Sequence, residues 1–286
     1  MITALLFIFG MVFGSFGYVL ALRYDEKHFL LDPKIVGGRS YCPHCKKTLK
    51  WYELIPFVSF AIQGGKCRNC KARISFIYPL IEVFCGLLFV AIAYFVHNFY
   101  MVSGVYFWIF TILWIAFFFA LLLISIIDIR IGIIPNELVW FLSLLSILIV
   151  IFSFFNFGSL NNSFLGQYGV LFGIQNNIWI NHILGALFSF ILFGGLVAIT
   201  KGRGMGFGDV KLSIPLGFAF GWPDVIFLFA FAFILGAIVG LFYITIGKKN
   251  MKSSLPFGPF LALGALIIFF YGFGLLNSYF HILGIA

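Results

Sequence analysis

Long apolar runs recur from one end of the chain to the other, and they constrain the fold more than any other feature. A helix needs about 20 apolar residues to cross the hydrocarbon core of a bilayer. Because 63% of the 286 residues are hydrophobic and only 9% are charged, we predict an all-α polytopic membrane protein. Eight spans are expected, at 2–22, 79–97, 103–127, 137–156, 183–200, 211–222, 225–246 and 257–276. The sixth is short and contains Pro215.

The basic residues predict an orientation. All 18 Lys and Arg fall in loops on one side of the membrane when the N-terminus is placed outside, and the opposite loops, including 157–180, contain none. Because basic loops stay in the cytoplasm, we predict a multi-pass protein of the plasma (cytoplasmic or inner) membrane with an external N-terminus. The net charge of +9 lies beside the membrane. Anionic headgroups of membrane lipids account for it, and no nucleic-acid partner is expected.

A single polar stretch interrupts the apolar sequence. The expected division is a first transmembrane helix at 1–22, a cytoplasmic tetracysteine loop at 23–78 and a transmembrane helical domain at 79–286. The polar loop is too short to bury a large core of its own. Its folding therefore calls for another source of free energy.

Two CxxC pairs in the polar loop supply that source. Cys42 and Cys45 are separated from Cys67 and Cys70 by 21 residues, which is the spacing of a four-thiolate zinc site. Binding of Zn²⁺ would fold the loop as a zinc knuckle. The alternatives are two disulfides or four free thiols, and the reducing cytosol disfavours stable disulfides.

Two acidic residues lie at the cytoplasmic edge of the expected spans. Asp128 ends the third span, and Asp209 follows the fifth in Gly206-Phe207-Gly208-Asp209-Val210-Lys211. Acids near the membrane are costly, so they are candidates for function. Two carboxylates at one depth suit aspartic protease chemistry, with one ionised and one protonated. Glycines beside Asp209 would admit a substrate backbone.

The sequence also allows other interpretations of these acids. Asp128 could pair with Arg130, and Asp209 with Lys211, as solvated boundary charges. A cation-coupled transporter would use Asp128, Asp209 and Glu82 as a path, although transporter acids are expected nearer the midplane.

Several motifs together resemble the type IV prepilin peptidase family, whose members are GxGD-type membrane aspartic peptidases. They occur in the family's order and are Gly14-Ser15-Phe16, Arg39 through Pro43 with Trp51 through Pro56, Gly65 through Cys70 with Ile74-Ser75 and Tyr78-Pro79 to Glu82, Asp128 with Ile134-Pro135-Asn136, Gly206 through Leu212, and Pro256-Phe257-Gly258-Pro259.

The resemblance implies about eight membrane helices, with Asp128 and Asp209 as the catalytic pair. Gly206, Gly208 and Lys211 would support the active site or the substrate. The implied substrates are prepilins and pseudopilins, cleaved after a glycine that ends a short basic leader at the cytoplasmic face. Members with the tetracysteine loop also N-methylate the new N-terminal residue with S-adenosylmethionine, and the residues implied for the methyl-donor region are Glu53, Gly65, Lys66 and Glu82. The alternative is a peptidase without methyltransferase activity.

Overall fold

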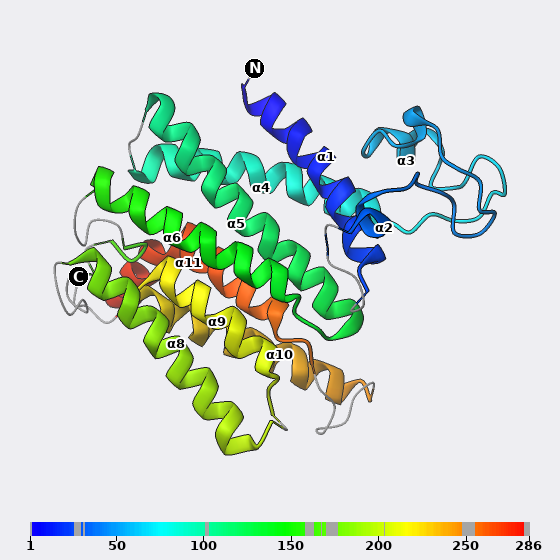
Figure 1. Ribbon diagram of the computed structural model, residues 1–286. Coiled ribbons are helices and arrows are strands. Elements are labelled where there is room, and N and C mark those ends of the chain that lie inside the picture. The colour runs from blue at the N-terminus through cyan, green and yellow to red at the C-terminus, as the bar shows by residue number, and fades with distance from the viewer. Residues whose placement is uncertain are drawn as a thin grey trace. The chain divides into compact units, whose positions relative to one another are not determined.

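The computed structural model describes residues 2–25, 30, 32–100, 103–157, 163–166, 168–169, 177–202, 204–247 and 255–282. Within these ranges the chain is helical, and its β-structure is limited to two isolated bridges. The chain divides into two compact units, Met1–Phe99 and Tyr100–Ala286. Helices are labelled as in Figure 1.

The first unit consists of two long apolar helices joined by a polar segment. Helix α1 spans Ile2–Arg23 and helix α4 spans Ile77–Tyr100. The segment between them contains three short helices, α2 (Pro33–Val36), η1 (Trp51–Glu53) and α3 (Val58–Ile62).

The second unit is a bundle of six helices within the described residues. They are α5 (Gly104–Ile131), α6 (Asn136–Phe157), α8 (Ile178–Thr200), α9 (Phe207–Phe220), α10 (Asp224–Thr245) and α11 (Gly258–Ile282). Helix α5 packs against α6 and α11, α9 packs against α6 and α8, and α10 packs against α11.

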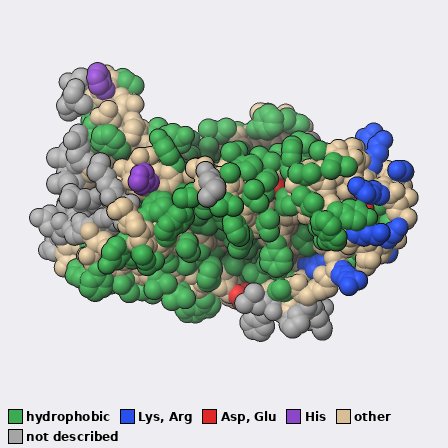
Figure 2. Space-filling model, turned by 90° about the horizontal axis from the view of Figure 1, so that it is seen from above, with side chains coloured by type: hydrophobic (Ala, Val, Ile, Leu, Met, Phe, Trp, Pro, Cys, Tyr) green, Lys and Arg blue, Asp and Glu red, His purple; other side chains and the backbone are tan. Residues whose placement is uncertain are grey.

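The expected membrane spans all form helices. Seven helices in the described residues are long and apolar enough to cross a bilayer: α1, α4, α5, α6, α8, α10 and α11. Hydrophobic side chains dominate the visible face in Figure 2. The sixth expected span forms α9, which has only 14 residues and ends at Gly221. The chain is therefore a multi-pass membrane protein in which α9 is shorter than its neighbours.

Three polar or close contacts hold α9 in the bundle. The Ser146 hydroxyl of α6 donates to the Pro215 carbonyl at 2.9 Å, and His182 Nδ1 of α8 lies 2.6 Å from the Phe218 carbonyl oxygen. Gly185 of α8 and Gly217 of α9 approach so closely that a Cβ on either would overlap the other's backbone. The C-terminal half of α9 is therefore fixed relative to α6 and α8.

Aromatic side chains fill the centre of the second unit. Trp114 of α5 is 1% exposed, and its ring contacts Phe117, Phe118, Phe220 and Phe269. Such aromatic contacts add to the free energy of burial. This core connects α5, α9 and α11, which carry the residues discussed next.

Part of the predicted orientation rests on residues outside the described ranges. These are Lys27, Arg203, Lys248, Lys249 and Lys252, together with most of the stretch 157–180. The orientation, like the expected division at residues 22 and 78, stays a prediction.

Candidate functional site

Asp128 lies in the last turn of α5, which continues past the predicted end of the third span to Ile131. Its side chain is buried, and its Oδ2 accepts a hydrogen bond from the Gly258 N–H at 2.8 Å. Gly258 is the first residue of α11. A helix N-terminus presents unpaired N–H groups and a partial positive charge, so it stabilises a carboxylate there.

Asp209 lies in the first turn of α9 and is also buried. Its Oδ2 accepts a hydrogen bond from the Gly206 N–H at 3.2 Å, so the carboxylate caps its own helix. Asp209 therefore occupies a defined position at the start of α9, outside the seven candidate spans.

The two aspartates interact. Burial, followed by the charge of Asp128, raises the pKa of the Asp209 carboxyl to about 6, against the opposing effect of the Gly206 N–H. Close carboxylates cannot both be ionised at little cost, so one of them retains a proton. The raised pKa thus favours a proton on Asp209 below about pH 6, so that one charged and one neutral carboxyl group can coexist under mildly acidic conditions.

The neighbouring motif residues also meet here. A Cβ on Gly208 would lie 3.3 Å from the Cβ of Ile134, so the start of α9 passes close to the turn before α6. Lys211 Nζ donates to Asn136 Oδ1 at 3.0 Å and lies 5.3 Å from the centre of the Phe207 ring. Lys211 therefore links α9 to the first residue of α6. The alternative of solvated boundary charges does not fit, because both aspartates are buried and bonded to backbone N–H groups.

Gly258 is a site residue whose contact the sequence did not reveal. It belongs to Pro256-Phe257-Gly258-Pro259, a recurring motif to which no role was assigned. A Cβ at this position would lie 2.8 Å from Asp128 Oδ2, so any other residue here would force the carboxylate to shift. The motif marks Gly258 as a candidate site residue, but no local sequence pattern connects Gly258 to Asp128.

The four cysteines of the polar segment form a second cluster. Their sulfurs all lie within 4.8 Å of one another, and Cys42 Sγ is 3.8 Å from Cys70 Sγ. Four ligands about 2.3 Å from a tetrahedral zinc ion would be separated by about 3.8 Å. All four cysteines are free thiols rather than disulfides. The cluster can hold a metal ion, and its dimensions fit Zn²⁺.

Each CxxC pair forms the same backbone turn. The Cys42 N–H donates to the Lys47 carbonyl and the Cys67 N–H to the Ala72 carbonyl, at 3.0 and 2.9 Å. Lys46 and Lys71 occupy the same place in the two turns, with left-handed φ values of 58° and 57°. The Lys47 N–H, followed by the Asn69 side chain, lowers the pKa of the Cys45 thiol to about 6. The contact with Lys47 thus favours the thiolate of Cys45, which is the form that binds metal.

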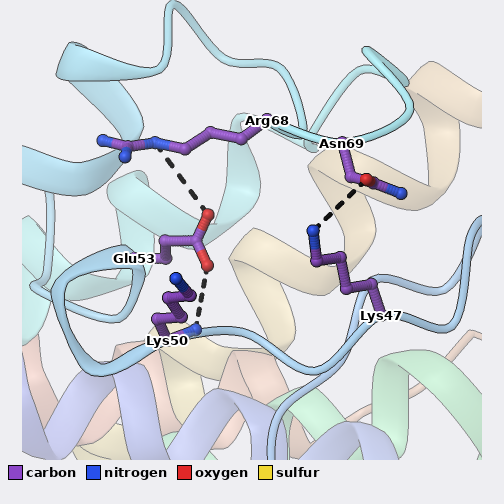
Figure 3. A network of polar contacts seen from close by, with 5 residues as sticks. All are labelled: Lys47, Lys50, Glu53, Arg68 and Asn69. Atoms are coloured by element: carbon purple, nitrogen blue, oxygen red, sulfur yellow. Dashed lines mark hydrogen bonds and ion pairs between the residues drawn. The ribbon is translucent and has the colours of Figure 1, made fainter.

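Side chains connect the two turns, as Figure 3 shows. Lys47 Nζ donates to Asn69 Oδ1 at 3.3 Å, and Arg68 Nε lies 3.9 Å from Glu53 Oε1. Glu53 Oε2 also accepts from the Lys50 N–H at 2.8 Å, as Figure 3 shows. The Arg68 guanidinium lies over the Tyr52 ring, 5.1 Å from its centre.

The residues expected in the methyl-donor region make separate contacts. Glu53 caps η1 and faces Arg68. Gly65 has a left-handed φ of 67° beside the Phe60 ring, and Lys66 forms a bridge with Arg73. Glu82 is buried in α4 and accepts from the Phe57 N–H at 2.8 Å. The structure gives each of these residues a local structural contact.

Two family models match the chain. The model described as the bacterial Peptidase A24 N-terminal domain matches residues 8–96, and the one described as the type IV leader peptidase family matches residues 115–241. The first match covers both CxxC pairs and the second covers both aspartates.

Several curated proteins are similar over most of their length. A prepilin leader peptidase/N-methyltransferase of Bacillus subtilis is 32% identical over 96% of this chain and 97% of its own length. Proteins of the same name from Stutzerimonas stutzeri and Pseudomonas aeruginosa are 31% and 30% identical, over 95% and 87% of this chain and 91% and 77% of their own lengths. No solved structure matches the chain.

Proposed function

Since the chain belongs to the type IV leader peptidase family and is a peptidase, we propose that Asp128 and Asp209 remove the leader from type IV prepilins or pseudopilins. The observation that carries this proposal is the burial of two interacting aspartates from different helices, each oriented by one backbone N–H group. Aspartic proteases use such a pair without forming an acyl-enzyme.

The contacts support different roles for the two carboxyls. Asp128 accepts the shorter hydrogen bond, at the N-terminus of α11, and is assigned as the ionised base that deprotonates a water molecule. Asp209, with its raised pKa, is assigned as the protonated partner that polarises the scissile carbonyl. Gly206 and Gly208 leave room for the substrate backbone, and Lys211 holds α9 against α6.

The expected cleavage point is the peptide bond after the glycine that ends the basic leader. The positive-inside rule supports placing this bond at the cytoplasmic face of the plasma (inner) membrane, with the N-terminus outside. In that orientation the apolar helix of the substrate stays in the bilayer while its leader reaches the aspartates.

Zn²⁺ is proposed as the structural ion of the polar segment, held by Cys42, Cys45, Cys67 and Cys70. The ion would fix both turns and so supply folding free energy to a segment with little buried apolar surface. No catalytic step is assigned to it.

The proposal includes a second activity, N-methylation of the new N-terminal residue with S-adenosylmethionine. It is supported by the name that the three relatives carry and by the presence of the whole tetracysteine segment in this chain. Glu53, Gly65, Lys66 and Glu82 remain the proposed methyl-donor region.

The test is a processing assay with the purified protein in detergent and a prepilin-like substrate, with and without S-adenosylmethionine. Wild-type protein should cut after the leader glycine, and the Asp128→Asn and Asp209→Asn variants should each lose at least about a thousandfold in rate. Mass spectrometry of the product should show the added mass of one methyl group only when the methyl donor is present.

Matched variants separate loss of chemistry from loss of fold. Lys201→Gln removes an exposed charge at the end of α8 and should leave cleavage unchanged. Cleavage without methylation would leave a peptidase alone. Full activity in both Asn variants would disprove the aspartate mechanism.

A further inference from the structure

Residues 51–62, called here the interfacial segment, expose apolar side chains within the otherwise polar part of the first unit. Trp51 is 77% exposed and Ile62 is 71% exposed. Four further apolar residues of the segment are exposed, namely Leu54, Ile55, Phe57 and Val58. Contiguous apolar surface of this kind is unfavourable in water and marks a surface that something covers.

The only charge in the interfacial segment is neutralised locally. Glu53 accepts from the Lys50 N–H and faces Arg68, and its side chain is 12% exposed (Figure 3). The carboxylate is therefore directed toward the metal-binding turns. The remaining surface of the segment is free to enter an apolar environment.

Two contacts fix the depth of the interfacial segment relative to α4. The Phe60 ring packs edge-on against Phe76, the residue before α4, with centroids 6.0 Å apart. The Phe57 N–H donates to Glu82, which lies five residues into α4. At 1.5 Å per residue, the bond is about 7 Å along α4 from its first residue. Because α4 is a candidate membrane span, the segment lies level with the membrane end of that helix.

The backbone at Phe57 is strained in order to make this bond. Its φ of 58° and ψ of −49° are unusual for a bulky residue. Glu82 is buried at the start of a membrane helix, where a carboxylate needs polar partners, and it also bonds the Ser15 side chain of α1. The strain is offset by satisfying that carboxylate. The contact therefore positions the segment firmly.

Basic residues flank the interfacial segment on both sides. Lys50 precedes it, and Lys66, Arg68 and Arg73 follow it, all with exposed side chains. Each basic residue close to an anionic bilayer contributes about 1 kcal/mol of attraction. An apolar segment that begins with Trp and Tyr and has basic neighbours is the composition expected of a segment lying in the bilayer interface.

We propose that the interfacial segment is a monotopic membrane anchor. Its apolar side chains enter the acyl-chain boundary of the same leaflet that α4 enters, and its basic neighbours bind anionic lipid headgroups. The four-cysteine site is thereby held at the membrane surface instead of extending into water. This inference does not depend on the proposed catalytic roles.

The test uses Trp51 as its own reporter. Wild-type protein and the Trp51→Phe variant are placed in vesicles of phosphatidylcholine and phosphatidylglycerol whose acyl chains are brominated near the carbonyl end. The difference between the two fluorescence signals belongs to Trp51. Brominated lipid should reduce it by roughly half, and aqueous iodide should reduce it by less than about a tenth.

A matched control moves the reporter to the exposed tip of the first turn, as His44→Trp in the Trp51→Phe background. This signal should respond to iodide and not to brominated lipid. Metal content, which should be unchanged in each variant, confirms that the segment is folded.

Three results would overturn the proposal. The Trp51 signal could follow iodide as the control does, which would show a solvated segment. It could resist both quenchers, which would show cover by protein. It could become shielded only after a prepilin-like peptide is added, which would identify a substrate-docking surface instead.

Discussion

The two units are stabilised in different ways. Between Gly37 and Ser75 of the first unit, the buried apolar side chains are those of Cys42 and Cys67, both of which belong to the metal-binding cluster. The second unit buries Trp114, Phe117 and Phe269 almost completely. The polar segment therefore has little apolar core besides its four-cysteine cluster, which we propose binds Zn²⁺, whereas packing organises the bundle that carries the aspartates. The difference predicts that the polar segment can be unfolded while the helical bundle stays intact, and the reverse.

The largest effect should follow removal of two metal ligands. Replacing Cys42 and Cys67 together with serine should abolish zinc binding, because structural zinc contributes about 10–16 kcal/mol to small sites. Elemental analysis and limited proteolysis should show a metal-free protein that is cut within the polar segment, with the second unit intact. Cys85→Ala, at a buried cysteine of α4, is the control and should keep its metal. Digestion of the second unit to the same extent as the polar segment would show that the two are not stabilised independently.

Damage to the aromatic core should destabilise the second unit and leave the metal content of the polar segment unchanged. Trp114→Ala should lower the free energy of unfolding of the second unit by about 3–5 kcal/mol, because it leaves a large cavity. Trp140→Ala, at a side chain that is 76% exposed on α6, should change it little. Thermal unfolding in detergent would measure both. Loss of metal in Trp114→Ala would contradict the independence of the two units.

A change at Gly258 should affect chemistry more than stability. In Gly258→Ala the new Cβ would displace the Asp128 carboxylate, and cleavage should fall by about a hundredfold, as expected for misplacement of a reacting group by about 1 Å. Gly274→Ala lies on the same helix in open space and is the control. Equal rates in the two variants would mean that the hydrogen bond from Gly258 does not position Asp128.

These contacts show what the sequence could and could not predict. The apolar runs gave the helices, because a membrane span is encoded by local hydrophobicity. The CxxC spacing likewise predicted a cluster whose sulfurs now lie within 4.8 Å of one another. Gly258 and Asp128 are 130 residues apart, so no local pattern could pair them. The contact between Phe57 and Glu82 was also hidden, because it depends on an unusual φ at a residue that normally avoids it.

The short length of α9 was expected, but its bounds differ from the predicted 211–222 for a different reason. Hydrophobicity continues through residue 222, but the helix ends at Phe220 because Gly221 adopts a φ of 74° before Trp222 and Pro223. The predicted placement of Asp209 just before this segment needed only a small change, since the residue lies in the first turn of α9.

A change of pH should affect cleavage less than the Gly258→Ala substitution does. The proton on Asp209 is expected to be essential, and the pKa of that carboxyl is raised to about 6, so activity should fall as pH rises through this value. Between about pH 6 and pH 7 the rate should drop roughly fivefold to tenfold, since each pH unit above the pKa costs up to a factor of ten. Initial rates in a constant-ionic-strength buffer series would measure this. A rate that increases with pH across the same range would reverse the assignment of Asp209 as the acid.

The smallest effect should come from loss of the ion pair between Arg68 and Glu53, which Figure 3 shows. Arg68→Met removes its contact with Glu53, but the Arg68 side chain is 48% exposed and solvent screens the pair. The metal-bound segment should lose no more than about 1 kcal/mol. Chelator competition would measure it, with Lys71→Met as the control. A metal affinity lowered by more than about a hundredfold would show that the pair does more than connect the second turn to η1.

The paired turns also have a consequence for how the chain is made. The second turn repeats the geometry of the first 25 residues later, from Cys42 to Cys67, and each supplies half of the ligands. During synthesis the first pair of thiols must wait for Cys70 before a tetrahedral site can close. The Phe57 bond must wait longer, until Glu82 has been added with α4. All four ligands of the cluster are thus synthesised before Glu82, so the cluster can close before the segment docks on the membrane helix that follows.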